Sequence, residues 1–157
     1  MWKVFRAEEI VDFAVQIERN GEQFYKALAE QTTDAELSSI FADLAAEEEK
    51  HIIDFQSLLE NLKNVSLNES YPGEYEDYVE GLAKNHVFTK GVDEALASVK
   101  NPIDGINMAL RFEQDSILFF YELKELVFGS NADIVDKLIK EEKKHIHRLL
   151  GIKNQYS

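Results

Sequence analysis

Two short motifs place a carboxylate and an imidazole at a spacing that suits metal binding. Glu48 and His51 form one Glu-x-x-His motif, and Glu142 and His145 form the other. Residues three positions apart on a helix project from the same side, so each pair can bind one ion together. The chain has no cysteine, which excludes thiolate sites, iron–sulfur clusters and disulfides. The remaining donors, carboxylate and imidazole, accept iron, manganese or zinc.

Two further glutamates extend the pattern. Glu18 precedes Glu48 by 30 residues, and Glu113 precedes Glu142 by 29. Each of the four interrupts an apolar stripe of helical period, which points into a core. A buried carboxylate costs several kcal/mol and its neighbours raise that cost, so the charges need compensation. Two divalent cations would match them, and one Glu from each of two helices with Glu-x-x-His from two others is the ligand pattern of di-iron and di-manganese bundles.

The chain also repeats itself. Residues 47–51 read Glu-Glu-Glu-Lys-His, and residues 141–145 read Glu-Glu-Lys-Lys-His. In the same way, the Ile-Glu and Phe-Tyr pairs within residues 17–25 align with the Phe-Glu and Phe-Phe pairs within residues 112–120. We therefore expect two similar helical hairpins that carry the same set of acids.

Four segments have the apolar periodicity of long helices. Thr33 with Glu36 is typical of a capping box, and Pro102 suits the first turn of a helix. The turn residues at 129–131 and Gly151 predict where the last helix begins and stops. The predicted helices run from about Ala7 to Gln31, Asp34 to Lys63, Ile103 to Val127 and Ala132 to Leu150.

A stretch of nearly 40 residues, 64–101, separates the second and third helices. It contains predicted short helices around Glu74–Lys84 and Val92–Val99. Such a length fits a crossover between two hairpins, which makes the second and third helices parallel. We therefore predict an all-α, ferritin-like four-helix bundle of two hairpins, with residues 1–157 forming one domain.

The heights of the glutamates test this arrangement. Two residues of an antiparallel hairpin are level when the turn lies midway between them. The midpoint of Glu18 and Glu48 is Thr33, at the predicted turn. The midpoint of Glu113 and Glu142 falls near 127–128, before the predicted turn, so the second hairpin needs an early helix end or a lopsided loop.

The overall charge limits the partners. The formal net charge is −13, which argues against nucleic acid and anionic membranes, because both attract basic surfaces. No stretch approaches the ~18 consecutive apolar residues of a membrane helix, and the N-terminus lacks a signal-peptide core. We therefore expect a soluble, cytoplasmic protein.

Five other residues are weaker candidates. Tyr25 and Tyr121 follow the first glutamates of the two hairpins by seven and eight residues and could hydrogen-bond ligand carboxylates, although core packing explains them equally well. Glu22 could be an extra ligand or lie outside the site. His86, in the crossover, and His147 are expected to pack or face solvent.

The chain resembles the ferritin-like superfamily and, within it, the rubrerythrin-like branch. The resemblance extends from about residue 7 to residue 150 and includes the long crossover. Tyr25 and Tyr121 match positions of tyrosines that lie beside the ligands in rubrerythrins. Because the sequence has no cysteine, the resemblance does not include the cysteine-rich rubredoxin-like domain of full-length rubrerythrins, and Ser116 stands where rubrerythrins carry a second glutamate. The matching ligand positions are Glu18, Glu48, His51, Glu113, Glu142 and His145.

The resemblance implies a carboxylate-bridged centre of two iron ions, with manganese or zinc as other occupants. It also implies reaction with hydrogen peroxide or dioxygen, electrons from an external donor protein, and a homodimer. We therefore expect a di-iron oxidoreductase. The alternatives are a non-catalytic, ferritin-like iron-handling protein and a helical module without metal.

Overall fold

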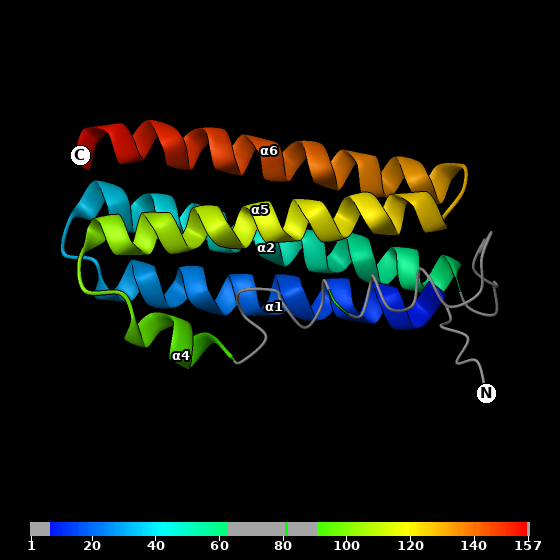
Figure 1. Ribbon diagram of the computed structural model, residues 1–157, viewed down its shortest axis with the longest axis horizontal. Coiled ribbons are helices and arrows are strands. Elements are labelled where there is room, and N and C mark those ends of the chain that lie inside the picture. Colours follow the sequence, from blue (N-terminus) through cyan, green and yellow to red (C-terminus); the bar gives the residue numbers. More distant parts are fainter. Residues whose placement is uncertain (1–6, 63–80, 82–90, 157) are drawn as a thin grey trace.

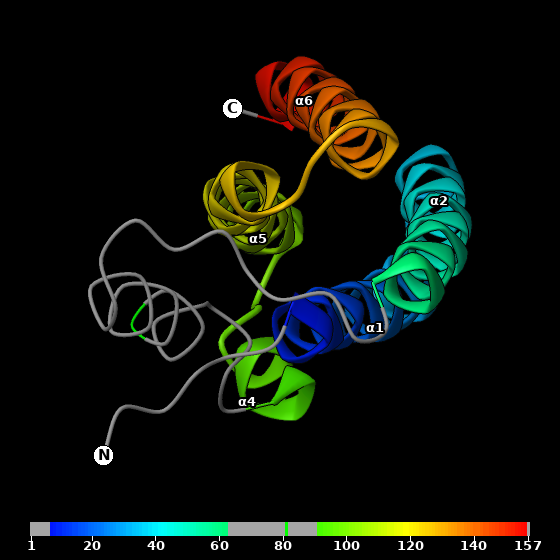
Figure 2. The same cartoon turned by 90° about the vertical axis from the view of Figure 1, so that its right-hand side faces the viewer.

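The computed structural model describes residues 7–62, 81 and 91–156, and four long helices form two antiparallel hairpins in it (Figure 1). Figure 2 looks along the bundle, where α1 lies beside α2 and α5, and α6 completes the ring. α2 and α5 run parallel, as the length of the crossover predicts. The all-α fold of two hairpins is therefore confirmed. The helices are α1 Ala7–Gln31, α2 Ala35–Asn61, α4 Val92–Ala97, α5 Pro102–Leu126 and α6 Ser130–Tyr156.

The crossover is described in part. α4 confirms the predicted short helix at Val92–Val99. The predicted helix at Glu74–Lys84 falls outside the described residues except for residue 81, and His86 falls outside them too. Within the described ranges, no helix combines the length and apolar character needed to cross a membrane.

The start of α2 differs from the prediction. Asp34, rather than Thr33, is the cap: its Oδ1 accepts a hydrogen bond of 3.0 Å from the backbone N–H of Leu37. Asp34 has extended backbone and directly precedes the first helical residue, where a cap side chain must lie. The capping box with Glu36 is therefore wrong by one residue.

The turn of the second hairpin is short. α5 ends at Leu126 and α6 begins at Ser130, two residues before the predicted start. Gly129 has a φ of +56°, a left-handed conformation that glycine adopts without steric cost. The early end of α5 and, to a larger extent, the early start of α6 centre the loop on residue 128, which removes most of the predicted mismatch in height.

The end of α6 is a second correction. The helix does not stop at Gly151 but continues to Tyr156. A glycine inside a helix costs only about 1 kcal/mol, and the continuation buries Ile152. It also lets the hydroxyl of Tyr156 donate a 2.6 Å hydrogen bond to Asp34. These gains explain why the stop signal fails.

The core is rich in aromatic rings packed between the hairpins. Tyr25 lies against Phe41 and Phe112 with ring centroids about 6 Å apart. Phe112 fits against Gly21, where an added Cβ would lie 2.3 Å from the tip of the ring. The close approach of α1 to α5 therefore depends on the missing side chain at position 21.

Candidate metal centre

The fold brings all six predicted ligands to one place. Each long helix contributes at least one candidate ligand, because the glutamates of each hairpin lie at the same height along the bundle. The side chains are shut off from solvent: the four glutamates are 0% exposed, and the two histidines are 1% and 2% exposed. The contributors are Glu18 of α1, Glu48 and His51 of α2, Glu113 of α5, and Glu142 and His145 of α6.

These residues form two clusters in which all ligand atoms lie within 4.8 Å of one another. The first cluster contains Glu18 and His51, and the second contains Glu113 and His145. Glu48 and Glu142 belong to both clusters, and we call them the bridging pair. Glu18 and Glu113 each belong to one cluster and form the terminal pair.

Each bridging carboxylate directs one oxygen to each histidine. Oε1 of Glu142 lies 2.8 Å from Nδ1 of His51, and its Oε2 lies 3.0 Å from Nδ1 of His145. Oε2 of Glu48 lies 3.3 Å from Nδ1 of His51, and its Oε1 lies 3.2 Å from Nδ1 of His145. The two imidazole rings stack with centroids 5.4 Å apart. Two carboxylates and two Nδ1 atoms therefore converge on adjacent positions.

The outer nitrogens of the histidines have carboxylate partners that sequence analysis missed. Nε2 of His51 lies 2.9 Å from Oε2 of Glu141, and Nε2 of His145 lies 2.5 Å from Oε2 of Glu47. Each glutamate comes from the other hairpin. The signal in the sequence was the repeat, in which an extra Glu precedes each bridging glutamate.

Burial and mutual charge set the protonation of the metal-free centre. Burial, and then the charges of the bridging pair, raise the pKa values of Glu18 and Glu113 well above the ordinary value. Burial would raise the pKa values of the bridging pair too, but the adjacent terminal carboxyl groups and histidines hold both values below the ordinary one. The terminal pair therefore binds protons more readily than the bridging pair.

The pKa values of the two histidines are also shifted by their surroundings. Burial would lower the pKa values of His51 and His145, but the surrounding carboxylates outweigh it and raise both strongly. Positive charge on the two imidazoles is therefore favoured beside the buried carboxylates. This mutual compensation lowers the cost of burying so many ionisable groups.

The terminal and bridging glutamates still carry unused acceptors. Among the described residues, both oxygens of Glu18, Glu48 and Glu142 lack a hydrogen-bond partner, as does Oε2 of Glu113. Buried acceptors without partners are costly, and divalent cations bound between them would remove that cost. The donor set therefore fits a binuclear metal site. The assignment of the six residues as ligands stays a prediction.

Tyr25 reaches one half of the centre. Its hydroxyl donates a hydrogen bond of 2.5 Å to Oε1 of Glu113. Burial and the charge of Glu113 raise the pKa of Tyr25 well above the ordinary value, so the hydroxyl keeps its proton. In the sequence repeat the equivalent of Tyr25 is Phe120, which has no hydroxyl. The two halves of the centre therefore differ by one phenol oxygen.

The remaining candidates lie outside the centre. The hydroxyl of Tyr121 accepts a hydrogen bond from Nζ of Lys143 on the surface, so the expectation that it contacts a ligand is not met. Tyr121 is one position beyond Phe120, which turns it outward. Glu22 pairs with Lys26 through a 2.5 Å contact, and His147 is exposed.

Ser116 occupies the place of the second glutamate of the resemblance. It is fully buried, and its Oγ donates a 2.8 Å hydrogen bond to the carbonyl of Phe112 one turn earlier. Its hydroxyl is thus used within α5. The position adds no charge to the centre.

A depression of about 230 Å³ lies over the histidines, between α2 and α6. Lys50 and Lys144, each directly before a histidine in the sequence, form part of its wall. The imidazole rings form its floor, so the depression connects solvent to the outer face of the centre. Its lining is Glu47, Lys50, His51, Glu141, Lys144 and His145.

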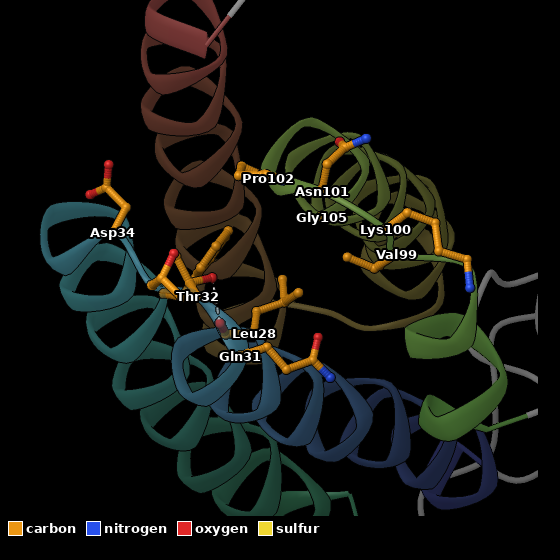
Figure 3. Close-up of a pocket in the computed structure, with 11 residues that line it drawn as sticks. Leu28, Gln31, Thr32, Asp34, Val99, Lys100, Asn101, Pro102 and Gly105 are labelled. Carbon is orange, nitrogen blue, oxygen red and sulfur yellow. Dashed lines mark hydrogen bonds between the residues drawn. The ribbon is translucent and has the colours of Figure 1, made fainter.

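A second cavity, of about 250 Å³, lies at the end of the bundle where the α1–α2 turn faces the start of α5 (Figure 3). It includes none of the six candidate ligands. Several of its polar groups are used by the helix ends: Thr32 donates to the carbonyl of Leu28, and Asn101 accepts from the N–H of Asp104. The cavity is thus formed where helix termini meet.

A sequence profile described as Rubrerythrin matches residues 9–153. The chain belongs to the rubrerythrin family. A search of curated proteins finds no significant match. Among solved structures, this rubrerythrin is similar to a Thermotoga maritima protein described as a ferritin-like diiron-carboxylate protein, with 27% identity, a TM-score of 0.78 and full coverage of both chains.

A hypothetical protein from Pyrococcus furiosus shares the fold. It is 21% identical, with a TM-score of 0.68, and the alignment covers 96% of this chain and 89% of that one. The ferritin-like fold of this rubrerythrin is therefore shared along nearly its whole length. The two buried carboxylate–histidine clusters are consistent with a ferritin-like binuclear metal site.

Proposed function

We propose that this rubrerythrin is a di-iron oxidoreductase that reduces hydrogen peroxide or dioxygen with electrons from an external donor protein. The supporting observation is the bridging pair: Glu48 and Glu142 each direct one oxygen to each half of the centre. Two ions held there would share ligands and lie side by side, an arrangement that suits two-electron chemistry.

Iron is the proposed metal. Carboxylate and imidazole donors accept iron, manganese and zinc, so the donor set alone leaves the metal open. The Thermotoga maritima relative is described as a diiron-carboxylate protein, which favours iron here. Two bound ferrous ions would supply one electron each. These two electrons, with two protons, are what the reduction of one hydrogen peroxide molecule to two water molecules requires.

The protein residues would bind the ions and control their surroundings. The four glutamates neutralise the charge of two divalent ions, and the histidines offer their Nδ1 atoms. Tyr25 holds one oxygen of Glu113 in place. Buried aromatic rings such as Phe55 and Phe120, with centroids 4.9 Å apart, keep the rest of the core dry. The depression over the histidines gives small oxidants an approach from solvent.

The test is anaerobic loading with two equivalents of Fe(II), followed by rapid mixing with hydrogen peroxide or with dioxygen. We expect oxidation of both irons within seconds by at least one oxidant, followed by further turnovers when a reductant is added. The zinc-loaded protein is the matched control and should not react. If two irons are bound and neither oxidant reacts, the oxidoreductase proposal is wrong.

A different result would favour the alternative function. Continued uptake of Fe(II) far beyond two ions per chain, with the iron retained in a large assembly, would indicate ferritin-like iron handling. A protein that binds no transition metal, and whose melting temperature does not change with Fe(II), would indicate a structural module.

A further inference from the structure

We propose that Glu47 and Glu141 are positioning residues that set the tautomer and orientation of the two histidines, each acting across the boundary between the hairpins. This inference rests on the proposed metal binding. Neither residue belongs to the two clusters of candidate ligands. Each touches the centre only through the outer nitrogen of a histidine.

Hydrogen-bond chemistry gives the first argument. An ionised carboxylate only accepts hydrogen bonds, so a nitrogen that faces it must carry the hydrogen. Glu141 therefore keeps the hydrogen of His51 on Nε2, and Glu47 does the same for His145. When the ring is neutral, the lone pair is then on Nδ1, which faces the bridging carboxylates. That is the tautomer a metal ion needs at this nitrogen.

The order of residues along the helix gives the second argument. Consecutive residues of an α-helix point about 100° apart, so two adjacent glutamates can address opposite sides of one ring. Glu142 lies 2.8 Å from Nδ1 of His51, and Glu141 lies 2.9 Å from Nε2 of the same ring. The tandem glutamates of α6 thus lie next to both nitrogens of one imidazole.

The other hairpin repeats the arrangement. Glu48 lies 3.2 Å from Nδ1 of His145, and Glu47 lies 2.5 Å from Nε2. The same construction therefore occurs twice, in opposite directions across the α2–α6 boundary. A chance surface ion pair would not recur at equivalent positions of the repeat.

The surroundings of the rings give the third argument. Both histidines line the depression between α2 and α6, together with Glu47 and Glu141. Glu47 and Glu141 are partly exposed at its edge, with 41% and 33% of their side chains accessible. Without these acceptors, water would compete for Nε2 and either tautomer could form.

The test is zinc titration of the purified full-length protein by calorimetry, with Glu141→Ala and Glu47→Ala compared with wild type. Loss of a carboxylate behind a metal-bound histidine lowers metal affinity by about 10–100-fold, and we expect that loss here. Glu141→Gln should lose less, because the amide oxygen still accepts the hydrogen bond of Nε2. Glu49→Gln, an exposed neighbour on α2, is the matched control and should bind zinc like wild type.

Nitrogen-15 NMR of the zinc-loaded protein separates positioning from mere stabilisation. We expect Nδ1 of both histidines to show the shift of a metal-bound nitrogen, and Nε2 to carry hydrogen. In Glu141→Ala the signals of His51 should change while those of His145 change little, and Glu47→Ala should do the reverse. If an alanine variant does not fold, the same NMR comparison is made with the glutamine variants of Glu47 and Glu141.

Wild-type zinc affinity and unchanged imidazole signals in the Glu47 and Glu141 variants would overturn the inference while leaving metal binding intact. Failure of the wild-type protein to bind any metal would instead overturn the proposed function. The two failures are thus distinguished by the wild-type titration alone.

Discussion

The hydroxyl of Tyr25 donates a 2.5 Å hydrogen bond to Oε1 of Glu113, which lies 88 positions later in the chain. This bond joins α1 to α5 inside the core and supplies a donor to a buried carboxyl group. The repeat does not duplicate this contact, because Phe120 stands at the equivalent position.

Tyr25→Phe should therefore destabilise the metal-free protein. The change leaves a buried acceptor without its donor, which costs about 1–3 kcal/mol. Urea unfolding followed by circular dichroism measures the loss. Tyr121→Phe removes an exposed hydroxyl and should change the stability by less than about 0.5 kcal/mol. Equal effects of the two variants would contradict the role of the buried bond.

Two glycine variants test the packing of α1 against α5. Gly21→Ala should lower the free energy of unfolding by about 1–3 kcal/mol, because its methyl group would overlap the ring of Phe112. Gly151→Ala, in an open position of α6, should raise it by up to about 1 kcal/mol through helix propensity. Thermal unfolding of the two proteins, compared with wild type, should show opposite signs.

The sharing of ligands predicts different losses of metal. Glu142→Ala removes a member of both clusters and should abolish binding of both ions, whereas Glu18→Ala removes a member of one. We expect close to one tightly bound ion per chain in Glu18→Ala and none in Glu142→Ala. Elemental analysis after gel filtration measures the content, and circular dichroism checks the fold. Equal metal content in the two variants would show that Glu142 does not bridge.

Metal binding should strengthen as the pH rises. In the metal-free protein the pKa values of His51, His145 and the terminal pair are raised, so these groups bind protons more tightly than they would in water. A metal ion must displace these protons, and each net proton released changes the affinity about tenfold per pH unit. Zinc calorimetry between pH 6 and 8, in buffers of different ionisation enthalpy, measures both the slope and the proton count. A flat profile would mean that the protons are absent.

The clustering of the six candidate ligands could be predicted from sequence because local rules place them together. Helical periodicity places Glu18 and Glu113 on buried stripes, and the turn at residue 33 makes Glu18 level with Glu48. The repeat then supplies the second hairpin. Each of these steps depends on spacing within one helix or one short turn, which the sequence states directly.

The partners of the histidines could not be found in this way. By helical phase, Glu47 and Glu141 fall beside the buried stripe and look like solvent-exposed residues. Their contacts depend on how closely α2 approaches α6, which is set by packing between hairpins. The same limit applies to Tyr25, whose partner Glu113 lies on another helix. Gly151 failed as a stop because burial of Ile152 outweighs a local signal.

The single phenol oxygen at Tyr25 gives the centre two distinguishable ends. Beside Glu113, one carboxylate oxygen is engaged by the hydroxyl and the other has no hydrogen-bond partner among the described residues; beside Glu18, both oxygens are in that condition. Two ions bound there would be neighbours with unequal environments, despite the near-symmetry of the duplicated hairpins. A spectroscopic measurement that distinguishes the two ions in wild type would thus detect the effect of the Tyr25 side chain.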